Sequence, residues 1–224
     1  MVAMGVAMLM MTLIYTAYRA QAASYRAQES VVDMMQSARG AMFYMERALR
    51  MSGFDPRRTA AAGFVANFAS PYNGAGAATN SAGIAFTVDD DEDGAIDASS
   101  AEIIAFRLDG SDQLQRLLID PGTLTAGWET LAENIDALNF VYLDGAAPPN
   151  VLTPPLSAAQ LASIRSVQVT LVARADDATA PSVQTKKGSQ VYRNQQGAII
   201  FDSGGDGITR SLLSAQVFCR NLGL

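Results

Sequence analysis

Histidine is absent from the 224-residue sequence, and cysteine occurs once, as Cys219. Without histidine, the Ser-His and Cys-His nucleophile systems, the usual zinc sites and the commonest general base are excluded. A single cysteine excludes an intrachain disulfide and a thiolate metal cluster, and its apolar neighbours predict a small buried side chain. Carboxylate-only hydrolysis stays chemically possible, but the spacing of the acids indicates no acid/base pair. The sequence therefore favours a protein that is not an enzyme.

Lysine is also scarce, since the sequence contains only two. They are the adjacent Lys186 and Lys187, and this pair predicts a loop tip. Residues 1–58 contain seven of the 16 basic residues and four of the 22 acidic ones. The body that follows is therefore distinctly acidic, and its basic residues do not cluster with aromatic ones. This balance argues against nucleic acid as a partner.

Charged side chains are missing altogether from residues 1–18, "MVAMGVAMLMMTLIYTAY". As a helix this stretch would span about 27 Å, close to the roughly 30 Å hydrocarbon core of a bilayer. The alternative is a cleaved secretory signal, since residues 20–22 resemble an A-x-A cleavage site. The lack of a preceding basic region and the position of Arg19 weigh against that alternative. The apolar residues expected to face lipid or neighbouring helices include Val2, Val6, Leu9, Leu13 and Ile14.

The helical pattern continues beyond the apolar run. Apolar residues recur at alternating steps of four and three, which indicates one stripe of an α-helix that would pack on a globular head. The pattern stops at "SGFDPRR", where Gly53 supplies a C-cap and Pro56 bars continuation. We expect a helix of about fifty residues, about 75 Å long. The stripe consists of Val31, Met35, Ala38, Met42, Met45 and Leu49.

Strand patterns dominate the rest of the chain. Residues 59–81 are rich in Ala, Gly and Asn and predict a loop. Strands are expected at 84–88, 102–108, 113–118, 139–143, 166–175 and 212–220, with a Pro-rich spacer and a short helical turn near 157–163. Strands that follow one long helix indicate an α+β fold with a mainly antiparallel sheet, and the stripe of the helix would cover one face of that sheet.

The order of these segments carries a family resemblance. An apolar helix that runs into an amphipathic helix and then into an acidic strand-rich body resembles the type IV pilin-like proteins. The segment "SARGAMFYMERALRMSGFDP" is similar to the end of the long helix in PilW-like minor pilins and in J-type pseudopilins of type II secretion. Four later segments resemble the successive strands of that family and its terminal Arg-Asn: "AEIIAFRLDGSDQLQR", "LAENIDALNFVYLD", "IRSVQVTLVARADD" and "SLLSAQVFCRNL".

Members of this family begin with a short basic leader that ends in Gly, followed by a Phe-rich start and a Glu. The present sequence opens downstream of these features, which a truncated sequence or a late start codon would explain. In the family the prepilin peptidase cleaves the leader, and the Glu helps to register neighbouring helices in the filament. The resemblance therefore assigns neither role to a residue of this sequence.

The decapeptide "VDDDEDGAID", residues 88–97, contains a possible cation site. Its pattern D-x-D-x-D-G-x-I-D matches the first nine positions of a calcium loop of the EF-hand type, whose oxygen-only ligands suit calcium. The twelfth position is Ser100, so a carboxylate at Asp97 or Glu102 would have to close the site. The alternative for this decapeptide is a solvated acidic turn. The segment "FDSGGDGI" at 201–208 matches the calcium-loop pattern less well, and it predicts a plain turn. The predicted ligands are Asp89, Asp91, Asp93, Ala95, Asp97 and Glu102.

These observations predict three parts: a transmembrane or filament-core half of the helix (1–22), its amphipathic half (23–53) and a globular β-rich head (54–224). The resemblance implies a structural minor pilin or pseudopilin, a partner of other pilins through its helix. Before assembly it would lie in the inner membrane with a periplasmic head, and afterwards at or near the tip of a filament that it helps to start. The alternative is a membrane-anchored, exported, calcium-dependent adhesin that does not polymerise.

Overall fold

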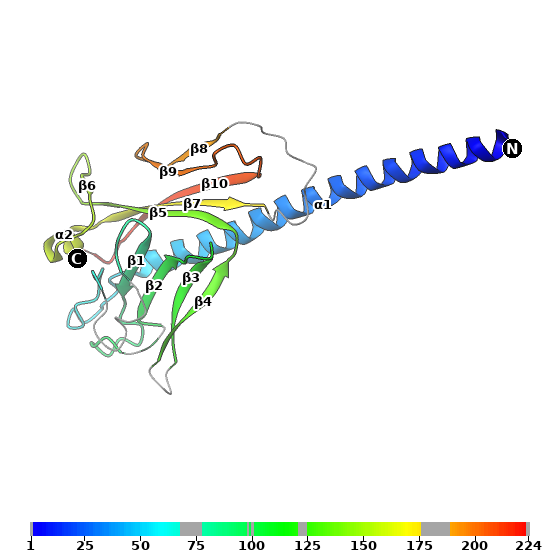
Figure 1. The fold of residues 1–224 in the computed structure, drawn as a ribbon. Helices are drawn as coiled ribbons and strands as arrows, with labels where there is room; N and C mark the ends of the chain where they lie inside the picture. The colour runs from blue at the N-terminus through cyan, green and yellow to red at the C-terminus, as the bar shows by residue number, and fades with distance from the viewer. Residues whose placement is uncertain are drawn as a thin grey trace.

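The computed structural model describes residues 2–67, 78–97, 99, 101–120, 125–175 and 189–222, and only the backbone of Val2. One long helix projects by its N-terminal half from a head made of strands (Figure 1). The elements are α1 (Val2–Met51), β1 (Gly83–Thr87), β2 (Ile103–Leu108), β3 (Leu114–Ile119), β4 (Ala126–Ala132), β5 (Ile135–Leu143), β6 (Val151–Leu152), α2 (Ala158–Ser163), β7 (Ser166–Arg174), β8 (Val191–Arg193), β9 (Ile199–Asp202) and β10 (Arg210–Phe218).

The long helix is continuous over 50 residues, as the sequence predicts. Every side chain from Ala3 to Gln21 is exposed, and Ala27 is the first buried apolar residue. From Ala27 onward one side of α1 lies on the head, where it contacts β4, β7 and β10. The same helix is therefore solvent-exposed all round in its first part and buried on one side in its second.

The stripe of α1 lies in the main hydrophobic core. Ala38, Met45 and Leu49 are fully buried, Met42 is buried, and Val31 and Met35 are partly buried at the edge of the core. The buried surface is wider than the predicted stripe and also includes Ala27, Met34 and Ala41. Two of these three flanking residues, Ala27 and Ala41, have small side chains.

Hydrogen bonds from distant parts of the chain terminate α1. The Ser52 hydroxyl donates to the carbonyl of Leu49 (2.7 Å), and the N–H of Gly53 donates to the carbonyl of Thr87 at the end of β1 (3.1 Å). Gly53 has a φ of +74°, the conformation expected of a C-cap glycine. The Asn221 side chain donates to two carbonyl oxygens in the last turn, at 3.3 and 3.4 Å. The terminal Arg-Asn motif thus contributes a cap to a helix that ends 170 residues earlier.

Within the described ranges, the strands form two antiparallel four-stranded sheets and a small hairpin. The first sheet has the order β1-β2-β3-β4, the second has the order β10-β7-β5-β6, and β8 pairs with β9. The α+β class and the antiparallel pairing are confirmed. The expectation of a single sheet is wrong, because the strands divide between two four-stranded sheets. Apolar residues of both sheets pack with α1 in one core. Sequence patterns define strands, but which strands share a sheet depends on contacts distant in sequence.

Strand positions agree with the predictions to within a few residues where the pattern is apolar. β4, β6, β8 and β9 were not predicted, since they are short or largely exposed, and β6 lies in the Pro-rich spacer. The predicted loop at 59–81 is described only in part, and there it forms isolated bridges between Phe64 and Phe86 and between Asn67 and Ala78. Lys186 and Lys187 lie outside the described residues.

A buried ionic network joins three strands and the loops beside them. Asp136 lies at a break in the β5–β7 register and pairs with both Arg174 (2.5 Å) and Arg210. Arg174 also bonds Asp112 (2.7 Å), and Arg210 bonds Asp206 (2.5 Å). The hydrogen bond to Asp206 is the main cause that raises the pKa of Arg210. Because the side chains of Asp136 and Arg210 are each 4% exposed, removal of either would deprive the other, a buried charge, of one of its two ion-pair partners.

Replacing the fully buried Met45 with Ala should lower the free energy of unfolding by about 2–5 kcal/mol, because it leaves a cavity between the helix and the sheets. Phe43→Ala is the matched control on the same helix, since Phe43 is 67% exposed and its loss should cost less than about 0.5 kcal/mol. Urea denaturation of the full chain in detergent, followed by tryptophan fluorescence, measures both. Equal losses in the two variants would contradict this packing.

Candidate functional site

The acidic loop between β1 and β2 begins and ends in the interior of the head. Asp89 is fully buried and Glu102 is 2% exposed, whereas Asp91, Asp93 and Asp97 are exposed. The N–H of Val88 donates to the carbonyl of Glu102 (2.9 Å), which closes the base of the loop. The acids at the two ends of the loop are buried because the loop starts and stops where the strands enter the core. The acids between them are exposed because they project beyond the strands.

The loop brings carboxylates together in two overlapping groups. Oxygen atoms of Asp89, Asp91 and Glu102 lie within 4.8 Å of one another, and so do oxygen atoms of Asp91, Asp93 and Asp97. Asp91 belongs to both groups. Five of the six residues predicted as metal ligands are therefore neighbours in the fold.

The remaining position, Ala95, is exposed in the same loop and donates its N–H to Asp93 Oδ1 (2.8 Å). Asp97 donates its N–H to Glu102 Oε2, so the two candidates for the closing carboxylate are in direct contact. Ser100, at the twelfth position of the pattern, lies outside the described residues.

Backbone hydrogen bonds shape the loop around its carboxylates. The two oxygens of Asp89 accept from the N–H groups of Asp93 and Gly94, each at 3.1 Å. Asp91 Oδ1 also accepts from the N–H of Asp93, at 3.1 Å. An oxygen-only set of this kind, part of it already oriented, fits the ligand preference of calcium. The residues present thus fit a calcium ion, and each carboxylate oxygen keeps a second lone pair for it.

The segment after α1 holds the outer side of this loop, a contact that the sequence did not reveal. Arg57 Nη1 donates to the carbonyl of Asp93 (2.9 Å), and the Thr59 hydroxyl donates to the carbonyl of Gly94 (2.9 Å). The N–H of Asp89 donates to the carbonyl of Phe54 (2.8 Å). The acidic loop is therefore tied directly to the end of the helix, and only the Arg-Arg pair after Pro56 could have hinted at an acidic partner.

The second acidic segment is a turn. Asp202 Oδ1 accepts from the Ser189 hydroxyl and from the N–H of Gly204, and Asp206 pairs with Arg210. Both carboxylates of the segment 201–208, Asp202 and Asp206, are therefore bonded to neighbouring protein groups.

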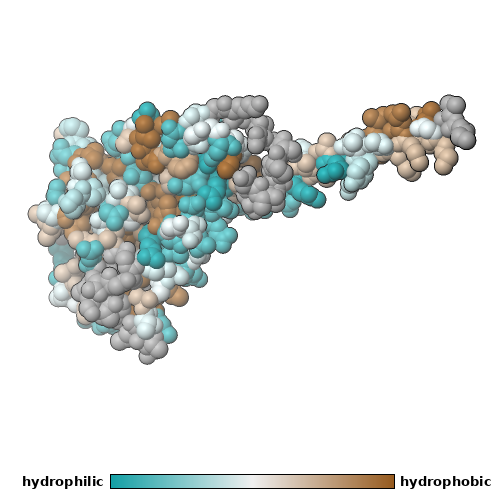
Figure 2. All heavy atoms as spheres, viewed as in Figure 1, coloured by the Kyte–Doolittle hydropathy of each residue, from teal (hydrophilic) through white to brown (hydrophobic). Residues whose placement is uncertain are grey.

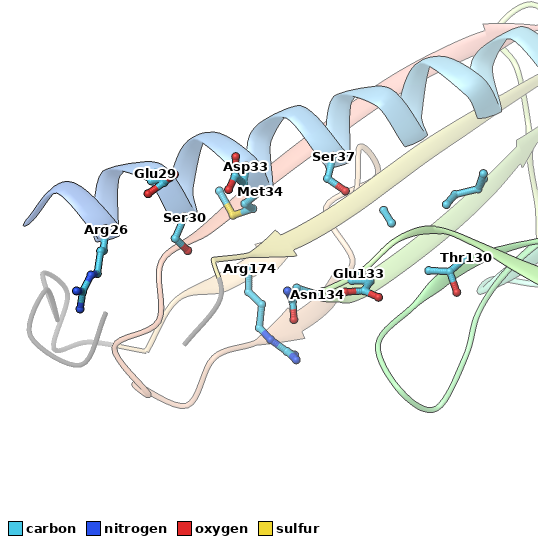
Figure 3. Close-up of a pocket in the computed structure, with 12 residues that line it drawn as sticks. Arg26, Glu29, Ser30, Asp33, Met34, Ser37, Thr130, Glu133, Asn134 and Arg174 are labelled. Carbon is cyan, nitrogen blue, oxygen red and sulfur yellow. The ribbon is translucent and has the colours of Figure 1, made fainter. Parts of the chain in front are cut away.

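A pocket of about 560 Å³ lies at the neck of the molecule, between α1 and the turn from β4 to β5. Figure 3 shows Glu133, Asn134 and Arg174 across from the helix residues. Glu29, Asp33 and Glu133 contribute acidic groups, while the guanidinium of Arg174 is engaged by Asp112 and Asp136. The pocket is open and polar, which suits contact with another macromolecular surface better than enclosure of a small molecule.

The free part of α1 presents an apolar surface to solvent. Figure 2 shows hydrophobic residues gathered at the far end of the helix. Of the residues expected to face lipid or other helices, Val6 is 49% exposed and Leu9, Leu13 and Ile14 are 61–69% exposed; the side chain of Val2 lies outside the described residues. Among the described residues, α1 is one helix with the length and composition to cross a membrane.

The single thiol is unsuited to nucleophilic chemistry. Cys219 is 2% exposed, and burial raises the pKa of its thiol above the ordinary value. A buried, protonated cysteine behaves as a small apolar residue, in agreement with the prediction from its neighbours.

A long helix with a free apolar half and an antiparallel β head defines the class of type IV pilin-like subunits. The same fold occurs in a type IV-like pilin from Thermus thermophilus, with a TM-score of 0.50, 12% sequence identity, and coverage of 84% of this chain and 98% of that one. No curated protein shows significant sequence similarity. The sequence profile of the family described as prepilin peptidase-dependent protein B (PpdB) matches residues 27–193, more than half of the chain. The chain therefore belongs to this family of type IV pilin-like minor pilins.

Gly94→Ala should disturb the acidic loop. Gly94 has a φ of +92°, and a Cβ built there would lie 2.4 Å from the Thr59 hydroxyl oxygen. We expect a loss of about 1–3 kcal/mol from backbone strain and the displaced contact. Gly110→Ala, in open space in the next turn, is the control and should leave the melting temperature nearly unchanged. Similar melting temperatures for the two variants would refute this account of the loop.

Proposed function

We propose that the protein is a structural minor pilin or pseudopilin, held in the inner membrane by the apolar half of α1 until it enters a type IV pilus-like filament. The observation that carries this proposal is the run of side chains from Ala3 to Gln21, apolar in most positions and exposed throughout. A stretch of this length that none of the described residues of the head covers needs another apolar environment, and lipid or neighbouring helices supply one.

The assembly step is an exchange of environments without covalent chemistry. In the membrane, the segment around Val6, Leu9 and Leu13 contacts lipid, and in a filament the same surface contacts the helices of other pilins. Such an exchange needs close packing between helices, because lipid and leucine side chains are equally apolar. All ten methionines lie in residues 1–51, and their flexible side chains suit a surface that changes partners.

The family name supports processing by a prepilin peptidase, which would act before assembly. A place at or near the filament tip, with a role in starting assembly, is proposed from the resemblance to PilW-like minor pilins and J-type pseudopilins. In this setting the head lies in the periplasm before assembly and on the filament afterwards.

The acidic loop is proposed to hold a calcium ion as a structural element. Asp89, Asp91 and Glu102 would form its buried side, with Asp93 and Asp97 completing the set. Calcium would neutralise carboxylates that otherwise repel one another. Because the loop is bonded to Phe54 and Arg57, the ion would stabilise the junction between helix and head.

Leu9→Arg combined with Leu13→Arg should remove the protein from both membrane and filament. Each arginine costs about 2.5–3.5 kcal/mol at the centre of a membrane helix. Gln21→Arg with Gln28→Arg adds the same charge to exposed polar positions and should be tolerated. Carbonate extraction measures membrane insertion, and electron microscopy with immunogold labelling measures incorporation. A double variant that still enters filaments would overturn the proposal, and a wild-type protein that inserts but never joins a filament would favour the adhesin.

Calcium should raise the melting temperature of the full chain, since an ion that binds the native state at one hundred times its Kd stabilises it by about 2.7 kcal/mol. Asp91→Ala with Asp93→Ala should abolish this rise and the calorimetric heat of binding. Asp90→Ala with Glu92→Ala removes the same charge from the same loop but from acids outside both carboxylate groups, so binding should persist. No heat at millimolar calcium for the wild type would identify a solvated acidic turn instead.

A further inference from the structure

The last strand of the head, β10, is an edge strand, and among the described strands it is paired on one side only. It lies at the end of the order β10-β7-β5-β6 and pairs with β7 without interruption from Arg210 to Phe218. In the described part of the chain, the backbone groups of β10 have hydrogen-bond partners only on β7. Whereas β7 is buried along nearly all its length, β10 alternates between exposed and partly buried residues. Nine residues of unpaired edge are long enough to accept another strand.

Residues 211–218 of this edge lack four of the features by which proteins prevent strand addition. Soluble proteins protect edges with charged residues, proline, bulges or very short strands. Residues 211–218, "SLLSAQVF", contain no charge and no proline, and the register with β7 has no bulge. By contrast, the opposite edge of the sheet, β6, has two residues, and the edge strand β4 of the other sheet carries Glu129. The unprotected edge of β10 is therefore a surface suited to pairing with a strand.

A groove beside the edge offers room for the side chains of an added strand. It has a volume of about 300 Å³ and lies between α1 and β10, which run alongside one another (Figure 1). Phe43 is 67% exposed there, and the exposed Arg39 could pair with an acidic side chain. On the other face of β10, Leu212 and Phe218 are 37% and 64% exposed. The groove is lined by Arg39, Met42, Phe43, Glu46, Leu213 and Ser214.

We propose that β10 accepts an extended segment of a different pilin-like subunit as an additional antiparallel strand, with apolar side chains against Phe43 and Leu212 and an acidic one near Arg39. This inference rests on the proposed function and names the partner surface of the head. The main-chain hydrogen bonds supply affinity and the groove supplies specificity.

The direction of α1 argues against β10 of a second copy as the occupant. Antiparallel pairs are the more stable strand pairs, and two copies joined β10 to β10 in that way would be related by a two-fold axis across the strands. Because β10 lies along α1, the two helices would then point in opposite directions. Two such helices could not enter one membrane from the same side. A different subunit can contribute its segment while its own helix stays parallel to α1.

Photo-cross-linking in cells that assemble the filament tests this inference on the full chain. The photoreactive residue p-benzoylphenylalanine replaces Leu212 on the exposed face of β10, and mass spectrometry identifies the cross-linked peptide. We expect an adduct with an extended segment of another pilin-like chain. Ser214→Lys should abolish most of this adduct, because a lysine at the edge disfavours pairing. The control Ile199→Lys, at a 58% exposed position on β9, should leave the adduct unchanged.

Two cross-linking results would overturn the inference: filaments that contain the protein but give no adduct from position 212, or an adduct whose peptide belongs to a second copy of this chain. Amide hydrogen exchange adds an independent measure. Those amides of residues 211–218 that do not bond to β7 should gain protection in isolated filaments relative to the detergent-solubilised protein, and equal exchange in both states would also overturn it. Absence of the protein from filaments would instead overturn the proposed function, which separates the two failures.

Discussion

The buried side of α1 is the contact on which the rest of the structure depends. Residues from Met34 to Leu49 share one core with apolar side chains of both four-stranded sheets, so a single helix buries its apolar side against both sheets. The helix in turn continues beyond the head, because the same backbone hydrogen bonds extend through its apolar half. A single rigid element therefore couples the position of the head to the surface that contacts lipid or other helices.

Polar contacts position the parts that the apolar core alone would leave free. Asp136 joins Arg174 to Arg210 across the second sheet, and Asn221 returns to cap the end of α1. Near the same end, Arg57 holds the acidic loop. The helix terminus is thus a junction of three segments that are far apart in sequence. A calcium ion in the loop would stabilise this junction.

Local patterns accounted for the elements whose signal is strong. The continuous helix, its end at Gly53 and the buried apolar strands follow from periodicity and cap chemistry, which act within a few residues. The division into two sheets and strand β4 did not follow from the sequence. β4 has exposed or half-buried residues at nearly every position, so its strand conformation comes from pairing with β3 and not from its own pattern. For the acidic loop, the residue types and spacing identified the candidate ligands, but the burial of Asp89 and Glu102 and the contact with Arg57 required the fold.

By itself, the sequence determined the long helix with its two kinds of surface, the α+β class, the exclusion of histidine-based chemistry and the acidic loop. These are properties of composition and short-range periodicity. The tertiary structure alone decided which strands share a sheet, which carboxylates approach one another and which edge remains open at β10. The physical reason is that burial and strand pairing depend on contacts between distant segments, up to 171 residues apart in the sequence, and no local pattern encodes those contacts.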